Sequence, residues 1–255
     1  MSLYVYCLGR ELAGKDVESL AGVGGATVRA LECGGLTAVV SDFDEGRVAL
    51  KREYLRAHNA VLAHVLAQTT PLPFRFGTLA DAPQLAAYVS KNRDALASSL
   101  ERVAGCVEMS VKVLWDEVAD AQASRAGAPA SPASETLTES ESSETSAADS
   151  ETTSGAGAAF LAAKRAALAG GERRRARADE ISSWVGARLA PHARSARSRV
   201  SPEERIVLRA SHLVESARVE EYREAVRRLG EEGGAGLRFL ASGPWPPYSF
   251  CDLRP

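Results

Sequence analysis

The four histidines and four cysteines of this 255-residue chain are its natural candidates for metal binding or nucleophilic chemistry. His58 and His64 lie six residues apart on one predicted helix, whereas a pair of helical metal ligands would be spaced by four. The cysteines contain no CxxC pair, which zinc sites and thioredoxin-type sites use; they are Cys7, Cys33, Cys106 and Cys251. We therefore predict reduced structural cysteines, a hydrogen-bonded core histidine at position 58, and no metal or cofactor.

Phosphate-binding and hydrolytic motifs are also missing from the sequence. The glycine-rich stretch 22–25 leads into a predicted strand, whereas a dinucleotide-binding loop follows a strand and opens a helix. No GxxxxGK[ST], HExxH, GxSxG or EF-hand pattern occurs. These observations predict a protein that is not an enzyme.

A basic run and an acidic stretch lie close together in the second half of the chain. Residues 158–199 hold ten Lys or Arg against three acidic residues, and the densest part contains Arg173, Arg174, Arg175 and Arg177. Residues 124–157 hold six acidic residues against one arginine. The run could bind an anionic surface. Acidic residues follow it directly, so we favour a solvated helix face.

Two segments rich in proline and aromatic residues are candidates for protein contacts. In PLPFRFGT, residues 71–78, a strand over 72–76 would place Phe74 and Phe76 on one face and Arg75 on the other. The second segment is GPWPPYSF, residues 243–250. Rigid aromatic side chains either seal a core or anchor an interface. The candidate interface residues are Phe74, Arg75, Phe76, Trp245, Tyr248 and Phe250.

The elements that position these segments alternate between strand and helix patterns. Gly34 and Gly35 separate two predicted strands by a tight turn. Helices are predicted over 50–66 and, after the N-cap Asp81, over 82–103. In the strand 107–115 apolar side chains alternate with mainly polar ones, so one face should meet a helix layer and the other mainly water.

The composition divides the chain into two folded parts. We predict an α+β domain over residues 1–123 and a disordered acidic insert over 124–157, because the insert has too little apolar surface to offset its ordering entropy. Residues 158–255 would form a helical region, with two helices or a kinked one around Gly170 and Gly171, and a second α+β domain. The fold class is thus two small α/β-sandwich domains of ferredoxin-like character, joined by the insert and the helical region.

The charge balance and hydropathy exclude some functions. The chain is 45% hydrophobic and 25% charged, with a net charge of −2 and a pI near 6.2. A general nucleic-acid binder would carry a basic excess. No apolar run is long enough to span a membrane, and the first residues do not form a secretory signal. The sequence predicts a cytoplasmic protein without a membrane or nucleic-acid partner.

Taken in order, several motifs resemble the gas vesicle GvpL/GvpF family. They are YVY at 4–6, HNAVL at 58–62, PLPFRFGT at 71–78, VEMSVKVLWD at 107–116, GAGAAFLAAKRA at 155–166 and GPWPPYSF at 243–250. The resemblance implies two α+β domains and no catalytic residues. It also implies an accessory or minor structural role, in which the protein binds the small amphipathic shell protein and assists assembly, with other gas vesicle accessory proteins as further candidate partners. The acidic insert and Cys7 depart from the family pattern.

Two alternatives stay open at this point. Ferredoxin-like folds host many functions, so a small-molecule sensor or enzyme is one of them. Against this alternative, the sequence shows no cluster of titratable residues that would form a site. The other is an anionic-surface binder that uses the run 173–177, whose association salt would abolish.

Overall fold

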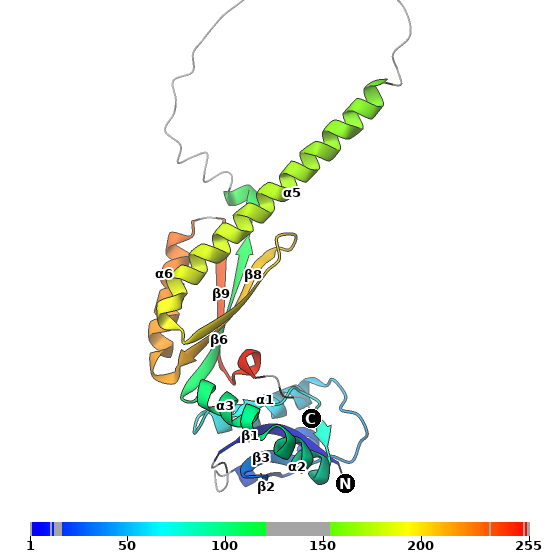
Figure 1. The fold of residues 1–255 in the computed structure, drawn as a ribbon, viewed down its shortest axis with the longest axis vertical. Coiled ribbons are helices and arrows are strands. Elements are labelled where there is room, and N and C mark those ends of the chain that lie inside the picture. The colour runs from blue at the N-terminus through cyan, green and yellow to red at the C-terminus, as the bar shows by residue number, and fades with distance from the viewer. Residues whose placement is uncertain are drawn as a thin grey trace, which may run out of the picture.

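The computed structural model describes residues 2–10, 12, 17–120, 154–234, 236–251 and 253, which form two antiparallel sheets with helices packed on them (Figure 1). The predicted α+β class is confirmed. One sheet has the strand order β2-β3-β1-β4, with β5 also pairing with β1, and the other has the order β7-β8-β6-β9. We call the parts built on these sheets the first unit and the second unit. The finer ferredoxin-like description stays a prediction.

The first unit comprises the elements up to Val103. Its strands are β1 (Leu3–Gly9), β2 (Val28–Cys33), β3 (Leu36–Asp42), β4 (Leu72–Pro73) and β5 (Leu79–Ala80). Its helices are α1 (Arg52–Leu66), α2 (Ala82–Lys91) and α3 (Arg93–Val103), with 3₁₀ turns at Val17–Ser19 and Val23–Gly25. The turn between β2 and β3 is confirmed: Gly34 and Gly35 have φ of 59° and 87°, which glycine adopts without steric cost.

The helix predicted over 82–103 is two helices in the structure. Asp81 caps α2 as expected and forms a capping box with Gln84. The helical path breaks at Asn92, whose side-chain amide donates to the carbonyl of Tyr88. Asparagine competes with the backbone for hydrogen bonds in this way, which explains the break.

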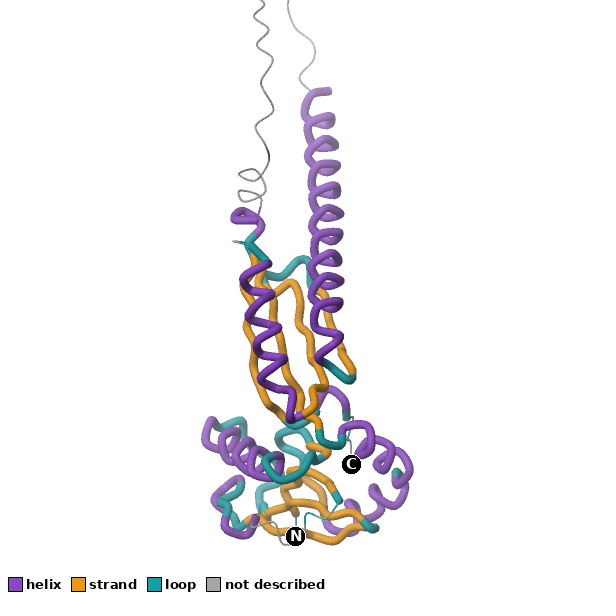
Figure 2. The backbone as a smooth tube through the Cα atoms, turned by 90° about the vertical axis from the view of Figure 1, so that its left-hand side faces the viewer, coloured by secondary structure: helices purple, strands orange, loops and turns teal. Residues whose placement is uncertain are grey.

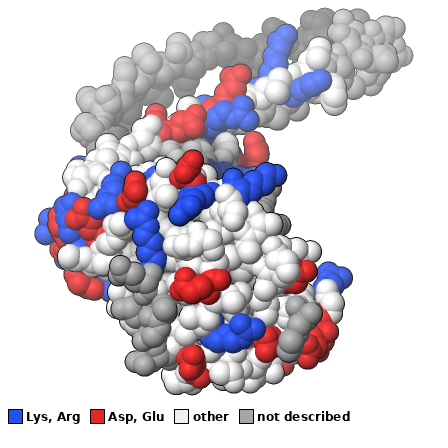
Figure 3. All heavy atoms as spheres, turned by 60° about the horizontal axis from the view of Figure 1, so that its bottom comes forward, with Lys and Arg blue, Asp and Glu red and all other residues white. Residues whose placement is uncertain are grey.

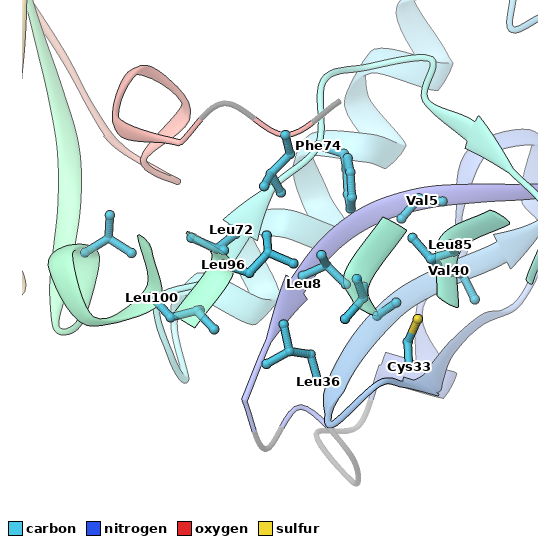
Figure 4. Packing of buried hydrophobic residues seen from close by; sticks show 14 of the residues in the cluster. Val5, Leu8, Cys33, Leu36, Val40, Leu72, Phe74, Leu85, Leu96 and Leu100 are labelled. Carbon is cyan, nitrogen blue, oxygen red and sulfur yellow. The ribbon is translucent and has the colours of Figure 1, made fainter. Parts of the chain in front are cut away.

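The first sheet is covered on both faces, so β1 is buried along its whole length. On one face Leu3, Val5 and Leu8 pack with α2 and α3 (Figure 4). On the other face Tyr4 and Tyr6 join a second apolar cluster with α1; its buried members from α1 are Val61, Leu62 and Val65. A β-bulge between Val5 and Cys7 shifts the alternation of β1 and turns Cys7 to the α1 side.

The second unit follows from Cys106. Its strands are β6 (Cys106–Trp115), β7 (Ser195–Val200), β8 (Ile206–Glu215) and β9 (Leu237–Trp245). Its helices are α5 (Ser154–Leu189) and α6 (Val219–Glu232), with 3₁₀ turns at Ala190–His192 and Ser216–Arg218. A last 3₁₀ turn, Tyr248–Phe250, follows β9.

Strand β6 belongs to the second sheet, which corrects its assignment to the domain predicted over 1–123. It is an inner strand there, paired with β8 and with β9. The boundary between the two units therefore lies near Gly105. A local pattern predicts that a segment is a strand, but the sheet it joins depends on partners about 100 residues later in the chain, β8 and β9.

The acidic insert consequently interrupts the second unit instead of joining two domains. Residues 121–153, and with them most of the predicted disordered insert 124–157, lie outside the described residues. Residues 154–157 form the start of α5. The prediction of two helices is wrong, because α5 runs as one helix through Gly170 and Gly171. Each glycine costs about 1 kcal/mol relative to alanine, and the alanine-rich surroundings favour the helix.

Helices α5 and α6 cover the same face of the second sheet (Figure 2). The buried side chains Val107, Val111 and Val113 of β6 point to these helices, as the alternation predicted. On the opposite face Lys112 is exposed, and only the end near Cys106 and Leu213 packs on the first unit. Within the described residues, none of the helices has the length and apolar character that a membrane span requires.

Candidate interaction site

The segment 243–250 lies at the junction of the two units and ties them together. Three consecutive residues contact three different places. Tyr248 hydrogen-bonds to α1 of the first unit, Ser249 hydrogen-bonds to β6 of the second, and Phe250 enters the apolar cluster that α2 and α3 share with β1. In Figure 4 the red C-terminal segment runs beside this cluster. Aromatic and polar groups of one short segment thus hold both units.

His58 connects this segment to the centre of the first sheet. Its Nδ1 lies 2.9 Å from the hydroxyl of Tyr4, and its Nε2 lies 2.9 Å from the hydroxyl of Tyr248. The amide of Gly77 also donates to the oxygen of Tyr4. Neutral His58 donates to one tyrosine through one ring nitrogen and accepts from the other tyrosine through the second. The hydrogen bond between His58 and Tyr248 joins residues 190 positions apart in the sequence.

The electrostatics of this network favour a structural role over proton transfer. Burial lowers the pKa of His58 to about 4 and raises the pKa of Tyr4 and of Tyr248 above their ordinary value. All three groups are therefore neutral at pH 7. A general acid or base would have a pKa near the working pH. The prediction of a hydrogen-bonded core histidine at position 58 is confirmed.

A buried carboxylate receives the next residue of the segment. Glu108 of β6 is 6% exposed and accepts two hydrogen bonds from Ser249, from the amide at 2.7 Å and from the hydroxyl at 2.6 Å. Hydrogen bonds to a charged acceptor are stronger than those between neutral groups. The two bonds fix the register of the segment against β6.

The six candidate interface residues divide by exposure. Phe74 and Phe250 are buried in the cluster with α2 and α3, so they pack inside the protein. Phe76 and Tyr248 are half-buried against the α1 side of the first sheet. Arg75 and Trp245 are exposed, and an interface role for these two stays a prediction.

Phe74 and Phe76 do not share a face, contrary to the predicted strand over 72–76. Strand β4 ends at Pro73, and the chain turns where the amide of Thr78 donates to the carbonyl of Arg75. Phe76 therefore packs near His58, with ring centroids 5.7 Å apart, whereas Phe74 packs with α2 and α3. The turn was not evident from local propensity.

Sequence reasoning missed Glu108 and Ser249. Glu108 occupied a polar position of an alternating strand, where solvent exposure is the ordinary expectation. Ser249 lies between two aromatic residues and gave no signal of its own. The pairing of β6 with the segment after β9 would have been needed to find them.

The outer half of α5 is a second candidate surface. Helix α5 extends well beyond the second sheet (Figures 1 and 2). Its described buried residues begin only at Ala178. Over the 20 residues 154–173, a length of about 30 Å, it exposes three large apolar side chains. They are Phe160, Leu161 and Leu168, with exposed fractions of 68%, 53% and 62%.

The arginine run at the middle of α5 is partly engaged within the second unit. Arg174 donates to Glu117 at 2.6 Å and to the carbonyl of Pro202 at 2.8 Å, and Arg177 pairs with Asp120 at 3.1 Å. These contacts fasten α5 to the end of the sheet. Two of the four arginines are therefore committed to folding contacts, which disfavours an anionic-surface binder built on this run.

Metal binding and thiol chemistry find no support in the described residues. Within them no group of three or more His, Cys, Asp or Glu could hold a metal ion. All four cysteines are free, as predicted, and burial raises the pKa of Cys7 well above its usual value. Protonated, buried thiols behave as small apolar groups.

Residues 2–252 match the family model described as gas vesicle synthesis protein GvpL/GvpF. Gas vesicle protein F of Streptomyces sp. (strain CB03234) is 31% identical over 99% of this chain and 100% of its own length. Gas vesicle protein L of the same strain is 28% identical over 98% of this chain and 92% of its own. The crystal structure of gas vesicle protein GvpF from Microcystis aeruginosa covers 99% of both chains with a TM-score of 0.74 and 19% identity, which indicates a shared fold.

Proposed function

Because this chain belongs to the gas vesicle GvpL/GvpF family, we propose that it is a cytoplasmic accessory protein that binds the small amphipathic shell protein and assists assembly of the shell. A subunit that exposes apolar surface before it assembles aggregates unless a partner covers that surface. The proposed role is to supply that cover at the growing vesicle. It includes no catalytic step and no cofactor.

The observation that carries the proposal is the apolar stripe on the outer half of α5. Leu161 and Leu168 are seven residues apart, so they lie on one side of the helix. Phe160 and the buried Ala178 are eighteen residues apart, which is five full turns. Phe160 thus continues the face that α5 packs on the second sheet, beyond the point where the sheet ends, and Leu161 and Leu168 widen this apolar surface by about 80–100° around the helix.

The energetics of this helix also favour a partner. Isolated helices shorter than about 12–15 residues are marginal in water, and most helical stability in proteins comes from packing of an apolar face. The outer half of α5 contains Gly170 and Gly171, which weaken it further. A second amphipathic segment that covers Phe160, Leu161 and Leu168 would supply the missing packing.

Co-expression with the shell protein tests the proposal. Tagged full-length protein should co-purify with the shell protein at low and at high salt, because apolar contacts are not screened by ions. The variant Phe160→Gln/Leu161→Gln/Leu168→Gln should lose co-purification and should reduce vesicle formation, measured by light scattering of cells. Glutamine retains good helix propensity, so α5 should persist.

The matched control changes exposed leucines elsewhere. Leu50 and Leu240 are 79% and 48% exposed and lie outside α5. The variant Leu50→Gln/Leu240→Gln should co-purify like the unmodified chain. Equal binding by the α5 variant and this control would refute the assignment of α5, and loss of binding in high salt would point to charged contacts instead.

A further inference from the structure

The open face of the second sheet forms a groove of about 530 Å³ against the first unit. Its lining comes from β6, β7 and β8, from the segment 248–251, and from Arg75 of the first unit. Five of the lining side chains are cationic: Arg75, Lys112, Arg197, Arg199 and Arg209. Serine residues also line the groove, namely Ser110, Ser198, Ser211 and Ser249. The groove is therefore basic and rich in hydrogen-bond donors.

Three of these cations lie side by side across neighbouring strands. Arg209 of β8 is directly opposite Lys112 of β6 on one side and Arg199 of β7 on the other. Side chains in such positions are about 5 Å apart at Cβ, and like charges directly opposite each other destabilise a sheet. The row thus lowers the stability of the fold unless something compensates it.

Two carboxylates lie at the groove, and one of them pairs with its cations. Among the described residues, Glu204 ion-pairs with the cluster, 2.7 Å from Arg209, whereas Glu108 accepts its hydrogen bonds from Ser249. Its hydrogen bond to Arg209 and the charge of Arg199 hold the pKa of Glu204 below its usual value. Arg197 lies over the ring of Phe250, 5.8 Å from the ring centroid.

Protection of a sheet edge does not explain the whole row. Charged side chains on an edge strand prevent sheets from pairing with each other, and β7 is an edge strand, so Arg197 and Arg199 fit that role. Lys112 and Arg209, however, are on the inner strands β6 and β8. Edge protection does not apply to these two cations, and an anionic partner would offset the repulsion between them.

We propose that this groove binds an extended acidic segment of a partner polypeptide. Arg197 and Arg199 are two residues apart on a strand, about 6.6 Å, which matches the spacing of alternate carboxylates on an extended chain. Arginine binds carboxylates through two parallel hydrogen bonds. Cations spread over three strands and a neighbouring unit suit an elongated ligand better than a single small anion. This proposal is independent of the apolar stripe of α5.

Fluorescence anisotropy with a labelled peptide of alternating Glu and Ser, about ten residues or 33 Å long when extended, tests the proposal. The full-length chain should bind this peptide at low salt and should bind the matched Gln-Ser peptide at least about tenfold more weakly. The variant Lys112→Gln/Arg199→Gln should weaken binding by roughly tenfold, and Arg75→Gln should weaken it by a smaller factor.

A charge-matched control distinguishes the effect of losing groove cations from the effect of changing the net charge of the chain. Arg227 and Arg228 of α6 are exposed and pair with Glu224, so Arg227→Gln/Arg228→Gln removes the same charge far from the groove. This control should change the affinity less than about twofold. The groove variant should also unfold at the same or a slightly higher temperature, because it relieves repulsion within the row.

Four results would overturn the proposal. Equal weakening by both double variants would make the attraction non-specific. Displacement of the peptide by inorganic phosphate, but not by chloride of the same ionic strength, would reassign the groove to a small oxyanion. Tighter binding of a single-stranded oligonucleotide with the same dependence on Lys112 and Arg199 would reassign it to nucleic acid. A large gain in peptide affinity after the acidic residues of 135–151 are neutralised would show that the chain's own stretch competes for the groove.

Discussion

The two sheets of this protein have the same strand order but are covered differently. Numbered within each unit, both have the order 2-3-1-4 with all neighbours antiparallel. The first sheet is buried on both faces, by α1 on one side and by α2 and α3 on the other. Among the described residues, helices cover one face of the second sheet, and these are α5 and α6. The first unit is thus built as a closed core, and the second leaves most of one sheet face open among the described residues.

The two units also differ in the connection between their first two strands, which is β1 to β2 in the first unit and β6 to β7 in the second. In the first unit the described part of this connection contains two short 3₁₀ turns, which stay close to β2 and α1. In the second unit it contains α5, whose outer half extends away from the sheet. Charged atoms of both signs alternate over α6 at the left of Figure 3. The apolar stripe of α5 and the basic groove therefore differ from α6, whose arginines pair with glutamates on the same helix.

The largest expected effect comes from Phe250→Ala, which tests whether a residue that follows the second sheet completes the core of the first unit. Phe250 follows the second sheet in sequence but is 2% exposed in the core of the first unit. Loss of a buried phenylalanine typically costs about 3–5 kcal/mol. We expect the free energy of unfolding, measured by urea titration, to decrease by this amount. The decrease should arise in the first unit, whose core contains Phe250.

Trp245→Ala is the matched control within the same segment. Trp245 is 45% exposed, so its removal should cost no more than about 1 kcal/mol. A large loss of stability in this variant would mean that Trp245 supports the fold and would exclude it as an interface residue.

Acid should weaken both units through one buried histidine in each. Burial lowers the pKa of His58 and of His212 to about 4, from 6.5 in the unfolded chain. The unfolded chain therefore takes up protons first as the pH falls below about 6.5, and the free energy of unfolding decreases until about pH 4. The loss is about 3 kcal/mol for each histidine, and it is absent above pH 6.5.

Urea titrations between pH 7 and pH 4 measure this effect. His58→Phe and His212→Phe should each remove about half of the decrease in that range. The ion-paired carboxylates Glu204 and Glu221 have lowered pKa values, so their contribution is lost only at lower pH. An unchanged pH profile in both variants would contradict the prediction.

A smaller effect distinguishes the hydrogen bonds of the two histidines. Tyr222 of α6 bonds to Nδ1 of His212 at 2.8 Å within the second unit, whereas Tyr248 bonds to His58 across the junction. Tyr222→Phe and Tyr248→Phe should each cost about 1 kcal/mol. Only Tyr248→Phe should increase amide hydrogen exchange in both the segment 248–251 and α1. Equal protection of α1 in the two variants would show that the junction is not coupled through His58.

Local patterns predicted much of the fold and little of the site. The alternation in β6, the turn at Gly34 and Gly35 and the cap at Asp81 each depend on neighbouring residues, and all three are confirmed. The family resemblance drawn from the motifs is also confirmed. The sheet that β6 joins depends on pairing distant in sequence, and the boundary at 123 failed for that reason.

The candidate site depended on the same long-range information. Phe74 and Phe250 were recognisable as anchors, but the sequence did not say whether they face inward. The basic groove was hidden for a related reason: Lys112 and Arg209 occupy polar positions of alternating strands, and only the register places them opposite each other. Periodicity gives the face of a residue, and register gives its neighbours.

The placement of Tyr248 and Phe250 in the first unit has a consequence for synthesis of the chain. His58 leaves the ribosome 190 residues before Tyr248, which at 5–20 residues per second corresponds to roughly 10–40 s. During this interval the first unit lacks Phe250 in its core and Tyr248 on Nε2 of His58. The nascent first unit therefore exposes an apolar gap until residues 248–250 are made, and a chain that stops short of residue 248 keeps that gap permanently.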